Sequence, residues 1–157
     1  MLFKLIIGLG NNDAEYRNTY HNVGHLFVDA ARETHPEYHA EKNDGYMNEA
    51  GASVKKIMRE YNARPEETLL VHDDSDLILG TYKFSVARGS AGHKGVKSVF
   101  DTVKSNAFPR LRIGIRPQPR TKDAPRKKAE EFVLKTISAA NKKILTDVFA
   151  KAMRALT

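Results

Sequence analysis

The stretch "TLLVHDDSDLILG", residues 68–80, combines a short apolar run with three carboxylates. Such a run is typical of a strand buried on both faces of a sheet, and we expect that strand over residues 68–74. Ligand sites of α/β proteins gather at the carboxyl ends of such strands, so the aspartates are candidates for a site. For Asp74 and Asp76 we favour a turn, in which the side chain bonds its own backbone. Asp73 either does the same or orients an imidazole by accepting its N–H.

Strands and helices are predicted to alternate along the chain on both sides of this stretch. Apolar runs and alternating patterns predict the strands, and apolar residues three or four apart predict the helices. The strands are expected over 3–9, 81–87 and 110–116, and the helices over 20–34, 48–61, about 94–103 and about 144–156. Residues 34–45 are polar and predict a loop. We therefore expect one α/β domain over residues 1–157, with a mixed, mostly parallel, twisted sheet and helices on both faces.

The composition excludes several classes of protein. With 157 residues, 41% hydrophobic and 29% charged, the chain has the make-up of one globular domain. No apolar run is long enough to cross a bilayer, and the start of the chain lacks the basic and small-residue features of a signal peptide. The absence of cysteine excludes disulfides and thiolate metal sites. We expect a cytoplasmic enzyme or binding protein without a membrane partner.

Positive charge is concentrated in the later part of the chain. Residues 1–50 hold 4 Lys/Arg against 8 Asp/Glu, whereas residues 51–157 hold 22 against 11. Eight basic residues and one acid lie between Arg110 and Lys128, and prolines keep residues 117–128 out of regular structure. We expect this stretch to be a mobile basic loop beside a strand with outward arginines, forming a surface for nucleic-acid phosphates. A basic face that is merely solvated remains the alternative.

The stretch "NTYHNVGH", residues 18–25, places His21 and His25 four residues apart, on one face of a helix. Two zinc ligands have this spacing, but Asn22 stands where the H-E-x-x-H motif has glutamate, and no third ligand is obvious. We therefore expect no metal. Two readings remain open from the spacing alone: ordinary helix histidines, or a proton-transfer residue.

Two glycine-rich turns do not match nucleotide-binding motifs. "GLGNN", residues 8–12, lacks the third glycine of the dinucleotide fingerprint, and "GSAGHKG", residues 89–95, lacks the Gly-Lys-Ser/Thr of a phosphate-binding loop. No nucleotide cofactor is expected. The second turn leads into a helix at His93 and Lys94, which is either a phosphate cradle or a helix entry that needs glycine.

Taken in order, the motifs resemble the bacterial-type peptidyl-tRNA hydrolase family. The similarity lies in "GLGNN", "EY", "HNVG", "YMNEAG", "HDDSDLILG", "GHKG", "FPRLRIGIRP" and "FVL", between about residues 5 and 134. It implies hydrolysis of the ester between a peptide and the 3′ ribose of tRNA, which releases tRNA for reuse, without metal or cofactor. It also implies the acceptor arm and CCA end of peptidyl-tRNA as the partner, and a monomer. The chain lacks cysteine and a G-x-S-x-G motif, which agrees with direct attack by water.

The resemblance also implies roles for individual residues. His21 matches the family's general base, which activates water, and Asp73 matches the partner that holds and polarises it. Asn11 matches the residue that senses the blocked N-terminal side of the substrate. Asn48, together with Tyr46 and Met47, matches residues that bind the peptide backbone and place the water.

Further contacts to tRNA follow from the same resemblance. Tyr16 matches a tyrosine at the tRNA 3′ end, and His93 and Lys94 match substrate contacts. His25 is then a neighbour on the helix of His21. Phosphate contacts are expected from the basic residues of the later part of the chain, namely Arg88, Lys97, Arg116, Arg120 and Lys122.

The chain departs from the family pattern at two places. Lys94 stands where the family usually has asparagine, and lysine donates hydrogen bonds but cannot accept them. The segment before "YMN" is also shorter than usual by roughly twenty residues, which predicts a smaller sheet and leaves the placement of Asn48 open. Two alternatives to the hydrolase stay in view: an RNA-binding relative without activity, and a metal-dependent hydrolase that uses His21 and His25.

Overall fold

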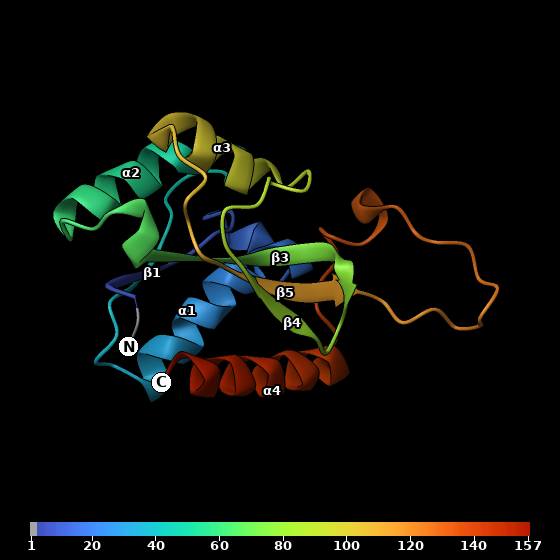
Figure 1. Ribbon diagram of the computed structural model, residues 1–157. Helices are drawn as coiled ribbons and strands as arrows, with labels where there is room; N and C mark the ends of the chain where they lie inside the picture. The colour runs from blue at the N-terminus through green and yellow to red at the C-terminus, as the bar shows by residue number, and fades with distance from the viewer. Residues whose placement is uncertain (1–2) are drawn as a thin grey trace.

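A five-stranded sheet runs through the protein in the order β2-β1-β3-β5-β4 (Figure 1). The computed structural model describes residues 3–157. All neighbouring strands are parallel except β4, which lies antiparallel to β5 at one edge. The strands are β1 (Leu5–Gly8), β2 (Ala40–Lys42), β3 (Thr68–Ile78), β4 (Tyr82–Ser85) and β5 (Arg110–Arg116). Within the described residues, no helix is long and apolar enough to cross a membrane.

Helices cover both faces of the sheet, as expected (Figure 1). On one face lie α1 (Val23–Thr34) and α4 (Ala139–Leu156), and on the other lie α2 (Ala50–Glu60) and α3 (Lys94–Val103). Short 3₁₀ turns connect these elements: η1 (Ala14–Tyr16), η2 (Tyr20–Asn22), η3 (Met47–Glu49), η4 (Pro65–Glu67) and η5 (Ala129–Glu131). The predicted α/β architecture is confirmed.

The strands supply two separate cores because successive side chains point to opposite faces. Ile6 and Leu69 pack with α1 and α4, whereas Ile7 and Leu70 pack with α2 and α3. This double burial is why the apolar runs of β1 and β3 are nearly continuous rather than alternating.

The central strand β3 is longer than predicted. It continues to Ile78, so Asp74 and Asp76 lie within the strand and not after its end. The register with β5 shifts between Asp74 and Ile78, and there the Asp76 N–H donates to Asp74 Oδ1 at 2.8 Å. The expected bond from Asp74 to its own backbone is thus present, at an irregularity inside the strand.

The expected loop over residues 34–45 contains the edge strand β2, parallel to β1. Of its three residues only Ala40 is buried. A strand this short and polar has too few residues to show a hydrophobic period, which explains why the prediction was wrong. The two early helices also begin later than expected, at Val23 and Ala50, because 3₁₀ turns carry the residues before them.

The strand predicted over 110–116 is confirmed as β5, but its arginines do not all face solvent. Arg110 is fully buried, and its Nη2 donates to the Gly89 carbonyl oxygen at 2.7 Å. The Arg112 Nε donates to Asp74 Oδ2 at 2.7 Å. The alternation of arginines and apolar residues was interpreted as a strand with one solvent-exposed face, but protein covers both faces of this strand. The expectation of outward arginines is therefore wrong for Arg110 and Arg112.

Helix α1 approaches the sheet unusually closely at Gly24. A Cβ there would lie 2.5 Å from the carbonyl oxygens of Leu9 and Val71, which belong to the backbone after β1 and within β3. Only glycine permits this approach, and the approach holds the start of α1 against the carboxyl-terminal end of β1.

We predict that Gly24→Ala destabilises the protein by about 1–3 kcal/mol or more, because the added methyl overpacks against backbone that cannot move aside. Urea unfolding followed by circular dichroism measures the change. Gly89→Ala is the matched control, since a Cβ at Gly89 meets nothing within 4 Å. Equal stability of the two variants would contradict the close approach.

Candidate active site

The site is built around a hydrogen bond between His21 and Asp73. His21 lies in η2, just before α1, and its Nδ1 is 2.7 Å from Asp73 Oδ2 on β3. Asp73 is buried, whereas about a fifth of the His21 side chain is exposed. Because the carboxylate accepts the Nδ1–H, the lone pair of the imidazole lies on Nε2, which makes no hydrogen bond within residues 3–157.

A second imidazole binds the other oxygen of the same carboxylate. His93 Nε2 lies 2.8 Å from Asp73 Oδ1, and His93 Nδ1 accepts the Val96 N–H at 3.2 Å. His93 is thus the N-cap of α3, and the cap requires an unprotonated Nδ1. Both ring nitrogens of His93 are therefore engaged, and in the neutral ring the proton lies on Nε2.

The shared carboxylate sets the charge state of the site. Burial acts to raise the pKa of Asp73, but attraction to His21 and His93 and their hydrogen bonds outweigh it and hold that pKa well below its ordinary value. Burial acts to lower the pKa of His21, but the charge of Asp73 and the bond to it outweigh burial, so that pKa lies above its ordinary value. The positive charge of Lys94 opposes this rise.

Behind Asp73 lies a buried layer that the sequence did not reveal. His72 Nδ1–H donates to the Asp73 carbonyl oxygen at 2.8 Å, and His72 Nε2 lies 3.3 Å from Arg110 Nη1. Burial, followed by the electrostatic effects of His93 and Arg110, lowers the pKa of His72 to about 3, so this ring stays neutral. Arg110 in turn binds Gly89, which opens the turn that carries His93. The alternating pattern of β5 grouped Arg110 with the other arginines of the strand, but it did not indicate His72 or Gly89 as its partners.

The backbone around His21 is held by the segment before α4. The His21 N–H donates to the Val133 carbonyl oxygen at 2.8 Å, and Thr19 and Thr136 form an antiparallel bridge. This pairing brings Leu134, about half exposed, beside the imidazole. The motif "FVL" thus contributes both the Val133 carbonyl oxygen and the Leu134 side chain to the site.

Two cavities of about 390 Å³ each meet at His21. The Asp73 cavity includes Asp73 and His93, and the Asn11 cavity includes the remaining expected substrate residues, namely Asn11, Tyr16, Tyr46, Met47 and Asn48. His21, Lys94 and Leu134 line both cavities. The structure therefore brings together all nine residues expected in the catalytic and substrate-binding groups.

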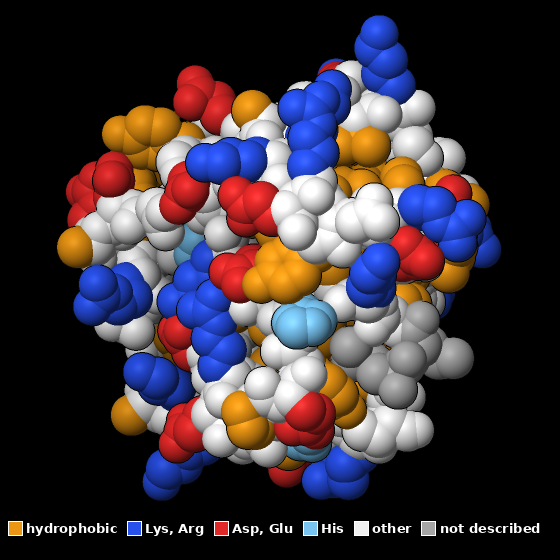
Figure 2. Space-filling view, turned by 90° about the vertical axis from the view of Figure 1, so that its left-hand side faces the viewer, with side chains coloured by type: hydrophobic (Ala, Val, Ile, Leu, Met, Phe, Trp, Pro, Cys, Tyr) orange, Lys and Arg blue, Asp and Glu red, His pale blue; other side chains and the backbone are white. Residues whose placement is uncertain are grey.

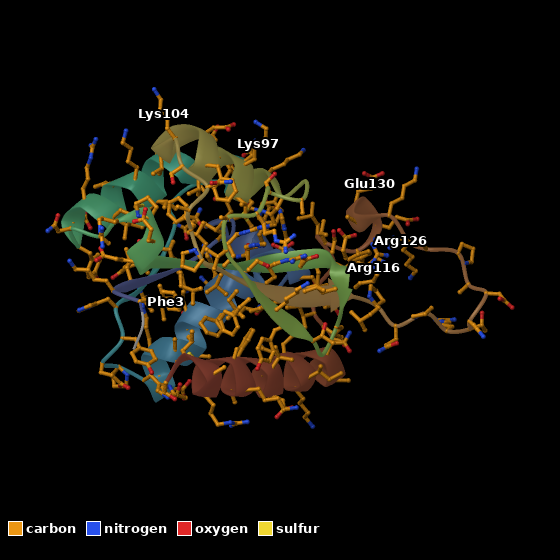
Figure 3. The ribbon with its side chains drawn as sticks, in the orientation of Figure 1. Phe3, Lys97, Lys104, Arg116, Arg126 and Glu130 are labelled. Carbon is orange, nitrogen blue, oxygen red and sulfur yellow. The ribbon has the colours of Figure 1, made fainter. Side chains whose placement is uncertain are left out.

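The expected phosphate contacts lie farther out. Arg116, Arg120 and Lys122 line a separate cavity of about 540 Å³ inside the basic loop (residues 117–128). Figure 3 places Arg116 and Arg126 at the base of this loop, where Arg126 pairs with Asp76 of β3. Lys97, on α3, pairs with Asp101, and Arg88 is exposed but lines none of these cavities.

Charge is mixed on the face opposite the basic loop. Figure 2 shows Lys and Arg side chains interspersed with Asp and Glu there, without a continuous basic patch. The loop, by contrast, projects from the other end of the molecule beyond β5 (Figure 1).

The pairing of His21 with His25 as metal ligands is not supported by their placement. His25 is buried, and its Nε2 lies 2.9 Å from Asn43 Oδ1. Among the described residues, the group with metal-ligand spacing is instead His21, Asp73 and His93. Hydrogen bonds within this group already satisfy both oxygens of Asp73.

A mixed α/β sheet with an imidazole–carboxylate pair facing a cavity is the arrangement of an α/β enzyme that uses general acid–base chemistry. The family model described as peptidyl-tRNA hydrolase matches residues 5–157. The chain belongs to the peptidyl-tRNA hydrolase family, in its bacterial form, as the motifs predicted.

Individual relatives agree with this assignment. The peptidyl-tRNA hydrolase of Aquifex aeolicus is 35% identical over 99% of this chain and 89% of its own length, and that of Sulfurihydrogenibium sp. is 37% identical over 96% and 87%. The crystal structure of the peptidyl-tRNA hydrolase from Acinetobacter baumannii is 26% identical, covers 97% of this chain and 85% of its own, and superposes with a TM-score of 0.80.

We predict that His21 titrates above pH 6.5 in the folded protein and that Asp73→Asn moves its midpoint below 6.5, because burial then acts without the carboxylate. NMR of the imidazole resonances measures this. His25 is the internal control, since burial lowers its pKa in both proteins. An unchanged His21 midpoint in the variant would contradict the pairing.

The same shifts determine how stability depends on pH. The pKa of His21 is raised, so its stabilisation is complete below pH 6.5 and is lost as pH rises through the folded-state value. The pKa of Asp73 is lowered, so its stabilisation is present above its unfolded value and is lost as pH falls through the folded-state value.

Proposed function

We propose that this protein hydrolyses the ester between the peptide and the 3′ ribose of peptidyl-tRNA, with His21 as the general base. The observation that carries the proposal is the 2.7 Å bond from His21 Nδ1 to Asp73, which leaves Nε2 available where two cavities meet. A substrate with two unlike halves, a nucleotide end and a peptide, suits two cavities that join at one base.

The reaction needs only proton transfers and a bound water. His21 Nε2 takes a proton from water while the water oxygen attacks the ester carbonyl. The tetrahedral oxyanion then expels the 3′ ribose oxygen, which takes the proton from Nε2. Free tRNA and the carboxylic acid of the peptide result, and this acid then releases its proton to solvent. Asp73 stabilises the imidazolium during these steps, and general-base catalysis of this kind contributes about 10²–10⁴-fold.

Asn11 is oriented so that it donates to the substrate. Its Oδ1 accepts the Met47 N–H at 2.6 Å, which turns Nδ2 away from that contact. Asn11 also lines the cavity that bears its name. An amide N–H₂ recognises a carbonyl, and a blocked substrate N-terminus carries an acyl carbonyl where a free amine has none. This supports the role of Asn11 in selecting peptidyl- over aminoacyl-tRNA.

The other residues of the Asn11 cavity offer polar and aromatic contacts. Asn48 is exposed, and its side chain makes no hydrogen bond within residues 3–157, so it is free to bind the peptide backbone. Tyr46 is half exposed and Tyr16 half-buried in the same cavity. Met47 is buried, and its contribution is its N–H to Asn11. The shortened segment before η3 therefore still delivers Asn48 to the site.

Lys94 lies beside the base and forms no ion pair within residues 3–157. It lines both cavities with His21, where an ammonium group can bind a terminal phosphate or the developing oxyanion. Its charge also opposes the rise in the pKa of His21, so it keeps more of the base unprotonated near neutral pH.

The basic loop supplies the contact to tRNA beyond the ester. Arg116, Arg120 and Lys122 line one side of its cavity, and the buried Arg116 Nε has no hydrogen-bond partner among the described residues. The loop is held at its base by Arg116 Nη1, which donates to the Lys127 carbonyl oxygen at 2.7 Å. We propose that the rest of the loop is mobile and closes on phosphates of the acceptor arm, with Arg88 and Lys97 as further contacts.

The protein is proposed to act as a monomer in the cytoplasm, where peptidyl-tRNA is produced. Two of the large exposed apolar side chains among residues 3–157, Tyr46 and Leu134, line the proposed substrate cavities.

Hydrolysis of N-acetyl-aminoacyl-tRNA in EDTA tests the activity. We expect the wild type to release free tRNA, and His21→Asn to be slower by about 10²–10⁴-fold because the base is lost. His39→Asn is the matched control, since His39 is exposed and lies outside the described cavities. Loss of activity in EDTA would favour a metal-dependent hydrolase, and a wild type that binds tRNA without cleaving it would favour an RNA-binding protein.

Salt dependence of tRNA binding tests the basic loop. The double variant Arg120→Ala/Lys122→Ala should reduce the slope of log K against log salt by about 0.7–0.9 for each phosphate contact removed. Lys55→Ala/Lys56→Ala removes the same charge from exposed positions of α2, which lies at the opposite end of the molecule (Figure 1). Equal slopes for the two variants would show that the loop is only a solvated basic face.

A further inference from the structure

Two asparagine side chains hold the backbone that follows β1. Asn43 makes hydrogen bonds to both backbone groups of Gly10, and Asn22 makes them to both backbone groups of Asn11. Two consecutive residues are therefore held as if each were paired with a strand. The second of them, Asn11, is the residue whose amide faces the proposed peptide cavity.

Asn43 extends the pairing of β2 with β1 by means of its side chain. The last backbone pair in register is Gly8 with Lys42, and beyond it the Asn43 N–H lies 3.4 Å from the Gly8 carbonyl oxygen. Beyond this point the side-chain amide of Asn43, and not the backbone of β2, makes the hydrogen bonds to the chain that follows β1. The Gly10 N–H donates to Oδ1 at 2.8 Å, and Nδ2 donates to the Gly10 carbonyl oxygen at 2.9 Å.

Burial makes these bonds costly to lose. Asn43 is fully buried, and an unpaired backbone group in such a place costs about 1–3 kcal/mol. Oδ1 also receives the Nε2–H of His25 at 2.9 Å, so both of its lone pairs are used. Nδ2 also donates to the Asp44 carbonyl oxygen at 3.2 Å, so the amide is held in one orientation and cannot flip without losing all four bonds.

The constraint continues from Gly10 to the side chain of Asn11. The Asn11 N–H donates to Asn22 Oδ1 at 2.7 Å, and Asn22 Nδ2 donates back to the Asn11 carbonyl oxygen at 2.9 Å. With the backbone held on both sides, Asn11 Oδ1 meets the Met47 N–H and Nδ2 is left for a ligand. Asn22 directly follows His21, so the same contacts set the distance between the base and this amide.

We propose that Asn43 is a positioning residue for the reaction, which holds Gly10 so that the Asn11 amide meets the acyl carbonyl of the substrate. The proposal rests on the proposed function and adds a residue with no direct substrate contact. It also explains how the short segment between α1 and η3 suffices to hold the backbone after β1. Where β2 ends, the side-chain amide of Asn43 makes the two hydrogen bonds that the backbone of a further strand residue would make.

A double-mutant cycle tests the proposal. With N-acetyl-aminoacyl-tRNA, we expect Asn43→Ala to lower kcat/KM by about ten- to hundredfold, since a small displacement of a positioning group has effects of this size. In an Asn11→Ala background the same change should have little further effect, because the group that Asn43 positions is then absent. Effects that multiply in full would overturn the proposal.

Substrate discrimination supplies a readout that a purely structural role would not move. The preference of the enzyme for N-acetyl-aminoacyl-tRNA over aminoacyl-tRNA should fall in Asn43→Ala toward that of Asn11→Ala. Asn12→Ala is the matched control, because Asn12 lies in the same loop and its side chain makes only an exposed bond to Asp44, among residues 3–157. An unchanged preference in Asn43→Ala would contradict the role.

Two further measurements keep the test decisive. If Asn43→Ala fails to fold, Asn43→Asp replaces it, since this side chain still accepts from Gly10 and His25 but no longer donates to the Gly10 carbonyl oxygen. The Asn11 side-chain amide resonances in a ¹⁵N spectrum should shift in either variant and stay unchanged in Asn12→Ala. If the wild type does not cleave the ester, that shift still supports the positioning while the proposed function fails. Unchanged resonances in the presence of activity would refute the positioning alone.

Discussion

A single buried carboxylate that binds two imidazoles governs this structure. Asp73 lies on the central strand β3, where burial disfavours its charge, and the N–H groups of His21 and His93 make that charge tolerable. These partners are 52 and 20 residues away in the chain, so neither is brought near by local structure. The charge is satisfied only when η2 and the start of α3 both dock against β3. The geometry of the site and the completion of the fold are therefore parts of one requirement, and His93 serves both because the same ring caps α3.

Much of the architecture could be predicted because it follows from local patterns. The apolar run of β3, the alternation of β5 and the helical spacing of α2 and α3 each depend on near neighbours in the chain. Each element is found in the expected stretch, although β3 is longer and α2 begins later than predicted. The prediction of the site, in contrast, depended on the resemblance to the peptidyl-tRNA hydrolase family. Spacing alone left His21 open between a helix histidine and a base, and left Asp73 open between a turn and a partner. The resemblance carried by the order of the motifs favoured the base and its partner, and in the structure the two side chains lie within hydrogen-bond distance.

The features that were missed are those set by distant partners. Strand β2 is too short to show a period, and its pairing with β1 depends on backbone far away in the chain. Arg110 looked like an outward arginine because alternation distinguishes two faces but cannot tell what covers them. Its partners, Gly89 and His72, come from elsewhere in the fold. Asn43 gave no signal at all, since an asparagine in a polar segment is ordinary until the backbone it holds is known.

The strand order also bears on the way the chain folds as it is synthesised. The central strand β3 pairs on one side with β1 and on the other with β5, so the sheet cannot close until residue 116 has left the ribosome. Pairings this distant in sequence form slowly. One face of the sheet stays uncovered for longer still, because α4 follows β5 in the chain and packs in the same core as Ile113 and Leu69. Until the eighteen residues of α4 have been synthesised, this apolar face of the growing chain lacks its cover, and exposed apolar surface of this kind favours aggregation.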